Sequence, residues 1–421
     1  MEGEIPLLES RSSRNKGTVS EFRTLGNIIV SVVGTGILGL PFAFRVSGWL
    51  AGSIGVAAAG IITCYCMLLL VQCRESIASQ ETTSEAITYG YLGYKCMGNG
   101  GRYFTEFLVS LSQCGGAIAY LIFIGQNLAS IFEGYGFSYS FFVFLLVPVE
   151  ILLSWIETLS SLAIVSIFAN LCNMIAMMIV VKDDVQKMLS DEFKFSERRA
   201  FAHDLRGLLF AVGMAVFCFE GFGMTLALEA SMANRGRFPN LLAKAFSAIT
   251  FVYILFGFSG YVAYGDQTSD IICLNLPSNW SAVVVKAGLC LALIFTFPIM
   301  LHPIRDIVEE KLARVKWVQD MSFNGDEART KVGTCLVYFV RSVLVIVLAV
   351  VASCIPGFGV FASLVGSTVC SLLSFVLPAT FHLMLCGKSL SCVRKGVDCL
   401  VLLCGLLVAI YGTYNAISSN L

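Results

Sequence analysis

The chain has 421 residues, of which 57% are hydrophobic and 13% charged, and its mean hydropathy is +0.81. Soluble domains average roughly 45–50% apolar and about 25% charged residues, so this composition excludes an ordinary soluble protein and indicates one that lies in lipid. The 28 basic and 28 acidic residues balance to a net charge of zero, which argues against a nucleic-acid partner.

The first 24 residues are polar and charged, and they predict a disordered cytosolic tail without a cleavable signal peptide. Leu7 and Leu8, with acidic residues nearby, resemble an acidic dileucine sorting signal for vacuolar or lysosome-like membranes. The usual acidic position four residues before the first leucine is Gly3, so an incidental pair of leucines is the alternative. We therefore expect a vacuolar membrane, with the plasma membrane as the alternative location.

Eleven segments are long and apolar enough to cross a bilayer, since a membrane helix needs roughly 20 mostly apolar residues. They are 25–45, 50–73, 105–132, 139–156, 159–181, 206–228, 241–264, 282–302, 333–354, 358–384 and 396–416. With the N-terminus in the cytosol, most Lys and Arg of the loops fall on the cytosolic side, as the positive-inside rule requires. The loop 182–205 is the exception, because it is rich in both signs of charge. The sequon at Asn279 falls on the far side and is a candidate for glycosylation.

The first and sixth segments contain glycine-rich stretches, GTG at 34–36 and EGFG at 220–223, where a membrane helix should be continuous. Irregular backbone is tolerated at this depth only where it lines a cavity or is buried in protein. Matching interruptions in two halves indicate a transporter binding site, and close helix packing around small residues is the alternative. The two stretches open two sets of five helices, 25–181 and 206–384, with opposite orientations. The remaining segment, 385–421, adds a linker and an eleventh helix.

Several stretches resemble the amino acid/auxin permease family. They are GTGILGLPFAFRVSGW in the first segment, SQCGGAIAYLIFIGQNL at 112–128, FCFEGFGM at 217–224, IPGFGVFASLVGS at 355–367 and SFVLPATFHL at 374–383. Within that family the chain is most similar to plant vacuolar amino acid transporters and animal proton-assisted ones. The resemblance implies an all-α polytopic membrane protein of the leucine-transporter-like fold, a five-plus-five inverted repeat with one additional C-terminal helix. Sodium-using members resemble one another in an Asn at the position of Val30, so its absence favours protons over sodium.

Glu220 is the sharpest single candidate. A carboxylate at the centre of a membrane helix costs about 2.5–3.5 kcal/mol on insertion scales, so we expect it to face the interior with a partner. It would take up a proton from an acidic lumen and release it at the pH of the cytosol. The alternative is a structural hydrogen bond to the first interrupted helix.

The substrate site is expected where the two interrupted helices expose their main chain. Free N–H groups would bind the carboxylate and free C=O groups the ammonium of an amino acid. The Thr35 hydroxyl would join the carboxylate cluster, unless it bonds to its own helix, and Phe222 would close over the substrate side chain. The predicted substrate-binding residues are Gly34, Thr35, Gly36, Ile37, Leu38, Tyr120, Gly221, Phe222, Gly223 and Thr296.

Together these features predict a secondary carrier of neutral amino acids, working by alternating access and exporting its substrate to the cytosol with protons. No GxxxxGK[ST] motif, no paired catalytic carboxylates and no Cys/His cluster with metal-ligand spacing are present, so we expect no enzyme activity, cofactor or metal. The expected partners are the amino acid, the proton and the lipid bilayer, and we expect a monomer. The alternative function is an amino-acid sensor of the same fold with little flux.

Overall fold

The computed structural model describes residues 18–80, 87–156, 159–191, 193–202, 204–277, 279–313 and 327–418, and Leu7 and Leu8 lie outside them. Within these ranges the protein is helical, and its one β-type pairing is the isolated bridge between Val19 and Met232. The helices of the first half are α2 (Glu21–Val32), α3 (Leu40–Ser47), α4 (Trp49–Gln80), α5 (Tyr89–Ile131), α6 (Tyr139–Ser154) and α7 (Leu159–Met188). Those of the second half are α8 (Leu205–Cys218), α9 (Phe222–Ser231), α10 (Phe238–Tyr264), α11 (Trp280–Ala313), α13 (Glu327–Ser353), α14 (Phe358–Val365), α15 (Leu377–Cys386), α16 (Cys392–Leu407) and α17 (Thr413–Ser418).

Each of the eleven predicted segments corresponds to one helix or one interrupted helix. In the described residues, eight helices are long and apolar enough to cross a membrane, and the bent pair of α2 and α3 would make a ninth. The shorter α6 and the 30-residue α7 account for the fourth and fifth segments. The first segment is α2 with α3, and the sixth is α8 with α9.

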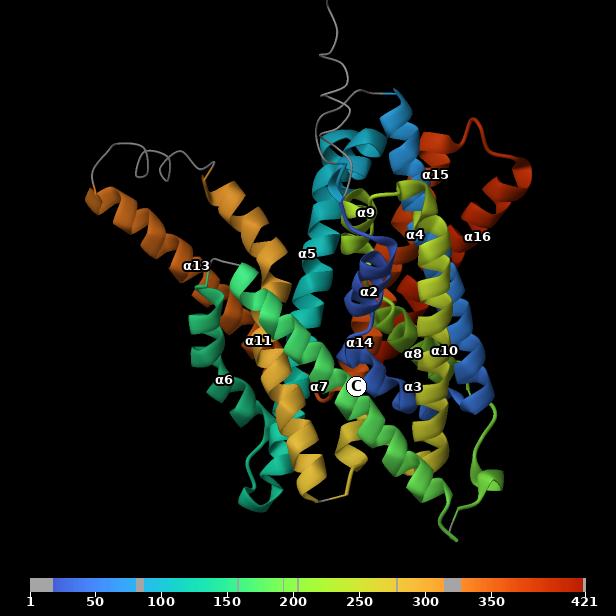
Figure 1. Cartoon of the computed structure of the whole chain (residues 1–421), viewed down its shortest axis with the longest axis vertical. Helices are drawn as coiled ribbons and strands as arrows, with labels where there is room; N and C mark the ends of the chain where they lie inside the picture. The colour runs from blue at the N-terminus through green and yellow to red at the C-terminus, as the bar shows by residue number, and fades with distance from the viewer. Residues whose placement is uncertain are drawn as a thin grey trace, which may run out of the picture.

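The helices form two groups with α5 between them (Figure 1). On one side lie α2, α3, α4, α8, α9 and α10; on the other lie α6, α11 and α13, while α7 crosses obliquely between the groups. The last helices, α15 and α16, pack at the edge beside α4. The start of α2 and the connection from α15 to α16 lie at the same end of the molecule, and the end of α10 lies at the opposite end.

Several boundaries differ from the sequence prediction. Helices α4, α7 and α11 run past the predicted ends of their segments, to Gln80, Met188 and Ala313. Structure begins inside the predicted tail 1–24, because Val19 bridges to Met232 and the Glu21 carboxylate pairs with Arg237 Nη1 at 2.8 Å. The third span begins well before 105, since α5 has 43 residues and a kink at Gly98. The φ angle of +65° at Gly98 is one that glycine adopts without a steric cost.

The charged segment 182–205, of which residues up to Met188 belong to α7, contacts the end of α10. The Arg198 side chain donates to the backbone oxygens of Val262 and Ala263 in the last turn of that helix, at 2.8 and 3.5 Å. Arg199 pairs with Asp266 at 3.0 Å, just beyond the helix end. Cations are favourable at a helix C-terminus, where carbonyl groups lack helical partners. These basic residues therefore hold the loop to the end of α10.

Candidate functional site

The first interruption separates α2 from α3 and is buried inside the protein. The helix ends at Val32, the chain runs extended through Gly34 (φ −109°, ψ −167°), and a 3₁₀ turn, η2 (Thr35–Gly39), leads into α3. The two helices are bent by 45° relative to each other. Ile37 and Leu38 are fully buried and Thr35 is 4% exposed. This is the protein-buried setting that irregular backbone requires at membrane depth.

The second interruption, between α8 and α9, lies directly against the first. Gly221 (φ 175°, ψ 9°) is the N-cap of α9. A Cβ placed on Gly221 would lie 3.2 Å from Val32 Cγ2, and one placed on Gly36 would lie 3.3 Å from Cys218 Sγ. A glycine of each interruption thus faces the helix end of the other, which is the close packing around small residues that the sequence offered as the alternative.

Tyr253 of α10 joins the two interruptions, and sequence reasoning missed it. Its fully buried hydroxyl lies 3.1 Å from the Val32 carbonyl oxygen and 3.1 Å from the Cys218 carbonyl oxygen. These carbonyls end α2 and α8, and the last carbonyls of a helix need partners from outside it. A tyrosine in the middle of an apolar span was the available signal, because a buried phenol usually finds a hydrogen-bond partner.

Glu220 lies between α8 and α9 and faces two serines on other helices. The Ser374 hydroxyl donates to Glu220 Oε2 at 3.5 Å, and the Ser112 hydroxyl and the Phe222 N–H also bond to this carboxylate. Ser112 belongs to α5, and Ser374 belongs to a π-helical turn, η9 (Leu372–Val376), which follows a second π turn, η8 (Gly366–Cys370). Turns of this π-helical kind are rare in proteins overall, and those that occur are often found at functional sites. Here they bring the span of α14 and α15 to the carboxylate.

The other predicted substrate-binding residues differ in how deeply they are buried. Phe222 is fully buried as the first residue of α9, and Tyr120 is partly buried on α5. Thr296 is partly buried on α11, and its hydroxyl donates to the Ala292 carbonyl of its own helix at 2.7 Å. Gly223 is exposed, and a Cβ there would meet nothing within 4 Å.

Asn279, the asparagine of the predicted glycosylation sequon, is exposed and lies just before α11. Its side-chain oxygen accepts hydrogen bonds from the Ser281 hydroxyl at 2.7 Å and from the Ala282 N–H at 2.9 Å. This oxygen therefore satisfies one of the free N–H groups at the start of that helix.

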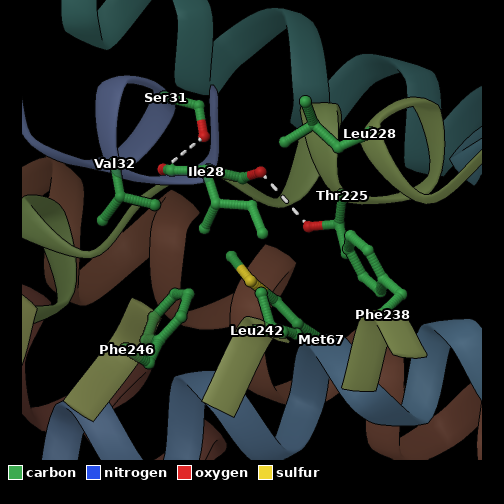
Figure 2. Close-up of a pocket in the computed structure, with 10 residues that line it drawn as sticks. Ile28, Ser31, Val32, Met67, Thr225, Leu228, Phe238, Leu242 and Phe246 are labelled. Atoms are coloured by element: carbon green, nitrogen blue, oxygen red, sulfur yellow. Dashed lines mark hydrogen bonds between the residues drawn. The ribbon is translucent and has the colours of Figure 1, made fainter. Parts of the chain in front are cut away.

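A small apolar hollow adjoins the second interruption (Figure 2). Four helices line this hollow. The lining residues are Ile28, Ser31 and Val32 of α2, Met67 of α4, Gly221, Thr225 and Leu228 at the start and in the first turns of α9, and Phe238, Leu242 and Phe246 of α10. The hydroxyls of Ser31 and Thr225 are turned to backbone oxygens of their own helices, Ile28 at 2.8 Å and Gly221 at 3.3 Å. The hollow is therefore lined almost entirely by carbon.

Two interrupted helices that meet inside a helical membrane protein are typical of the leucine-transporter-like fold. The structure is similar to that of Mhp1 in its inward-facing conformation, with a TM-score of 0.62 and 13% identity over 96% of this chain and 92% of that one. At this identity the likeness shows the fold, and it confirms the predicted fold class.

The chain belongs to the family described as transmembrane amino acid transporter protein, whose profile matches residues 17–418. It is 56% identical to the amino acid transporter ANT1 of Arabidopsis thaliana, over 98% of this chain and 96% of that protein. It is 28% identical to the vacuolar amino acid transporter 4 of Saccharomyces cerevisiae, over 96% of this chain and 58% of the yeast protein. The predicted family is confirmed, and the chain is a transporter of this family and not an enzyme.

Proposed function

We propose that the protein is a secondary-active carrier that exports neutral amino acids from the vacuolar lumen to the cytosol together with protons, by alternating access. The observation that carries the proposal is the meeting of two interrupted helices beside a carboxyl group, Glu220, in the membrane interior. The name of the yeast relative supports the vacuolar location, and the absence of an Asn at Val30 supports protons over sodium.

The helix ends are suited to the two charges of an amino acid. N–H groups at the start of η2, at Thr35 and Gly36, would bind the substrate carboxylate, because the N-terminal end of a helix favours anions. The Gly34 N–H already donates to the Val32 carbonyl oxygen at 3.0 Å. The carbonyl ends of α2 and α8 would face the ammonium group. Tyr253 already bonds to Val32 and Cys218 there, so it orients these carbonyls and takes up part of their capacity.

The remaining site residues have distinct roles in this proposal. Thr35 would add a hydroxyl donor to the carboxylate cluster, with Ile37 and Leu38 packing behind the turn. Phe222 would close over the substrate side chain. Gly221 and Gly223 would allow the substrate to approach the start of α9. Tyr120 and Thr296 would line the site from α5 and α11, where the Thr296 hydroxyl retains its capacity to accept a hydrogen bond.

Glu220 would link the proton to the movement. Its carboxylate accepts hydrogen bonds from Ser112 and Ser374, which lie on helices other than the interrupted one. When the carboxyl group is protonated it becomes a weaker acceptor, and the interrupted helix is held less firmly to α5 and η9.

The test is transport by the purified protein in liposomes. Wild type is expected to exchange labelled neutral amino acid in counterflow and to accumulate it when a pH gradient is imposed. Glu220→Gln should retain counterflow and lose its dependence on the pH gradient. Glu133→Gln, an exposed acid in the short turn η3 (Glu133–Tyr135), is the matched control and should behave as wild type. Binding of the amino acid without any flux would overturn the carrier in favour of a sensor, and unchanged proton dependence in Glu220→Gln would remove this residue from the coupling.

A further inference from the structure

A second buried acid lies far from the two interruptions, in the last pair of helices. His382 Nδ1 of α15 is 2.7 Å from Asp398 Oδ2 of α16, and the Tyr65 hydroxyl of α4 donates to Asp398 Oδ1 at 2.6 Å. The His382 side chain is 2% exposed and that of Asp398 is fully buried. Three helices from different parts of the chain thus place a titratable pair in the interior of a membrane protein.

We propose that His382 and Asp398 form a second proton-binding site, which exchanges one proton with the end of the molecule at which α2 begins. The inference deepens the proposed function and rests on it, because the proposed function is what couples this proton to amino acid transport. The ligand of the site is the proton itself.

The charge of the pair explains why it would hold a single exchangeable proton. With one proton shared between the imidazole and the carboxyl group, the pair is neutral overall, which is the state that a low-dielectric interior tolerates best. Loss of that proton leaves one negative charge on Asp398, and the Tyr65 hydroxyl bond still stabilises this charge. Gain of a second proton would leave a buried net positive charge. A purely structural tie between α15 and α16 would need only two neutral polar groups.

Few other charged side chains act on the pair, so no neighbouring ion pair fixes its protonation state. Arg394, one turn before Asp398 on α16 and exposed, is the cation that acts on this cluster. The other groups whose charge acts on this cluster are mostly thiols and phenols, together with Glu220, whose charge acts on Tyr89: Cys64, Tyr65, Cys66 and Cys73 on α4, Tyr89 and Cys96 on α5, and Cys386 on α15. The same helices also carry charged residues: Arg74 and Glu75 on α4, Lys95, Arg102 and Glu106 on α5, and Lys395 on α16. A proton that enters or leaves therefore changes the net charge of the cluster.

The position of the pair relates it to Glu220. His382 lies eight residues after Ser374, the serine that faces Glu220, which is about 12 Å along a helix at 1.5 Å per residue. Tyr89 of α5 lies beside the same stretch: its hydroxyl donates to the Leu373 carbonyl at 2.6 Å, and its ring is 5.8 Å from that of Phe381. The pair thus lies between Glu220 and the connection from α15 to α16. In the proposed orientation this is the cytosolic side, toward which a coupled proton is released.

Transport by His382→Gln and Asp398→Asn tests the inference, because both variants keep hydrogen-bonding groups of similar size. Each is expected to retain counterflow exchange, which needs no net proton movement, and to lose most of the uptake that a pH gradient drives. His302→Gln on α11 and Tyr411→Phe, an exposed tyrosine in the same span as Asp398, are the matched controls and should show wild-type uptake. Gradient-driven uptake with a wild-type pH profile in both pair variants would overturn the proposal.

A second measurement does not depend on transport. The chain has three histidines, so replacing His203 and His302 by Gln leaves His382 as the single imidazole for ¹⁵N-histidine NMR. We expect its ring shifts to report a proton shared between Nδ1 and the Asp398 carboxylate, and to move when Asp398→Asn is added. Ring shifts that do not respond to Asp398→Asn would overturn the site. Wild-type liposomes that show no gradient-driven uptake would instead refute the proposed function, whichever result the spectra give.

Discussion

The two interrupted helices occupy matching places in the two halves of the chain, yet they differ in chemistry. The interruption at 33–39 contains a buried 3₁₀ turn of small and apolar residues. The interruption at 219–221 is shorter, and it carries Glu220, which two serines from other spans reach. Each half of the chain thus contains one interruption, but only the second interruption carries a side chain that can bind a proton. Substrate binding and proton binding are therefore expected to respond to different substitutions.

The packing behind the second interruption should be the most sensitive to change. A Cβ on Gly366 of η8 would lie 1.8 Å from the Gly213 oxygen on α8, so backbone would have to move. Gly366→Ala should cost at least the upper end of the about 1–3 kcal/mol typical of overpacked cores, with a matching loss of folded protein on size exclusion in detergent. Gly26→Ala on α2, which meets nothing within 4 Å, is the control. Wild-type thermal stability in Gly366→Ala would show that the contact between α8 and η8 is not close.

Tyr253→Phe should affect both interruptions at once. The phenyl ring still fits, but the Val32 and Cys218 carbonyls lose a shared donor, and a buried polar group without its partner costs about 1–3 kcal/mol. We expect a lower thermal unfolding temperature and a raised KM for the amino acid. Tyr411→Phe removes an exposed hydroxyl and should change neither. If KM rises without any loss of stability, Tyr253 acts on the substrate rather than on the helix ends.

The smallest effects are expected from replacing one glycine by alanine in each interruption, and the two variants should differ from each other. Gly221→Ala brings a Cβ to 3.2 Å from Val32 and 3.6 Å from Met67, which should cost about 1 kcal/mol and slow transport. Gly34→Ala meets nothing within 4 Å and has a φ of −109°, which alanine adopts, so its stability should stay within about 0.5 kcal/mol of wild type. Thermal unfolding and counterflow measure both. A loss of transport in Gly34→Ala at wild-type stability would support the predicted contact of the substrate with Gly34, and wild-type transport would remove Gly34 from the site.

The positions of the spans and of the interruptions could be predicted from the sequence, because apolar length and glycine content are local properties. The start of α2 inside the predicted tail could not, since it depends on contacts of Val19 and Glu21 with the chain beyond α9. The same holds for the beginning of α5 at Tyr89, where less apolar residues are nonetheless helical around a glycine kink.

At the candidate site, the sequence identified the groups that belong to one helix and missed those that act across helices. Glu220 stood out because an acid in a membrane helix is costly. Ser112, Ser374 and Tyr253 did not, because hydroxyl groups are common in such helices and most bond to their own backbone, as Thr296 does. The pairing of His382 with Asp398 was hidden for the same reason, since their contact depends on how α15 and α16 are rotated toward each other.

By itself the sequence determined that this is a polytopic helical membrane protein with two interrupted spans and a buried acid. Lipid offers no hydrogen bonds, so a chain of this composition must form helices, and it may interrupt them only inside protein. Only the tertiary structure decided which partners meet those interruptions: the shared phenol of Tyr253, the serines around Glu220 and the buried pair of His382 and Asp398. Such contacts depend on the depth and rotation of each helix, which are set by side-chain packing between helices distant in the chain.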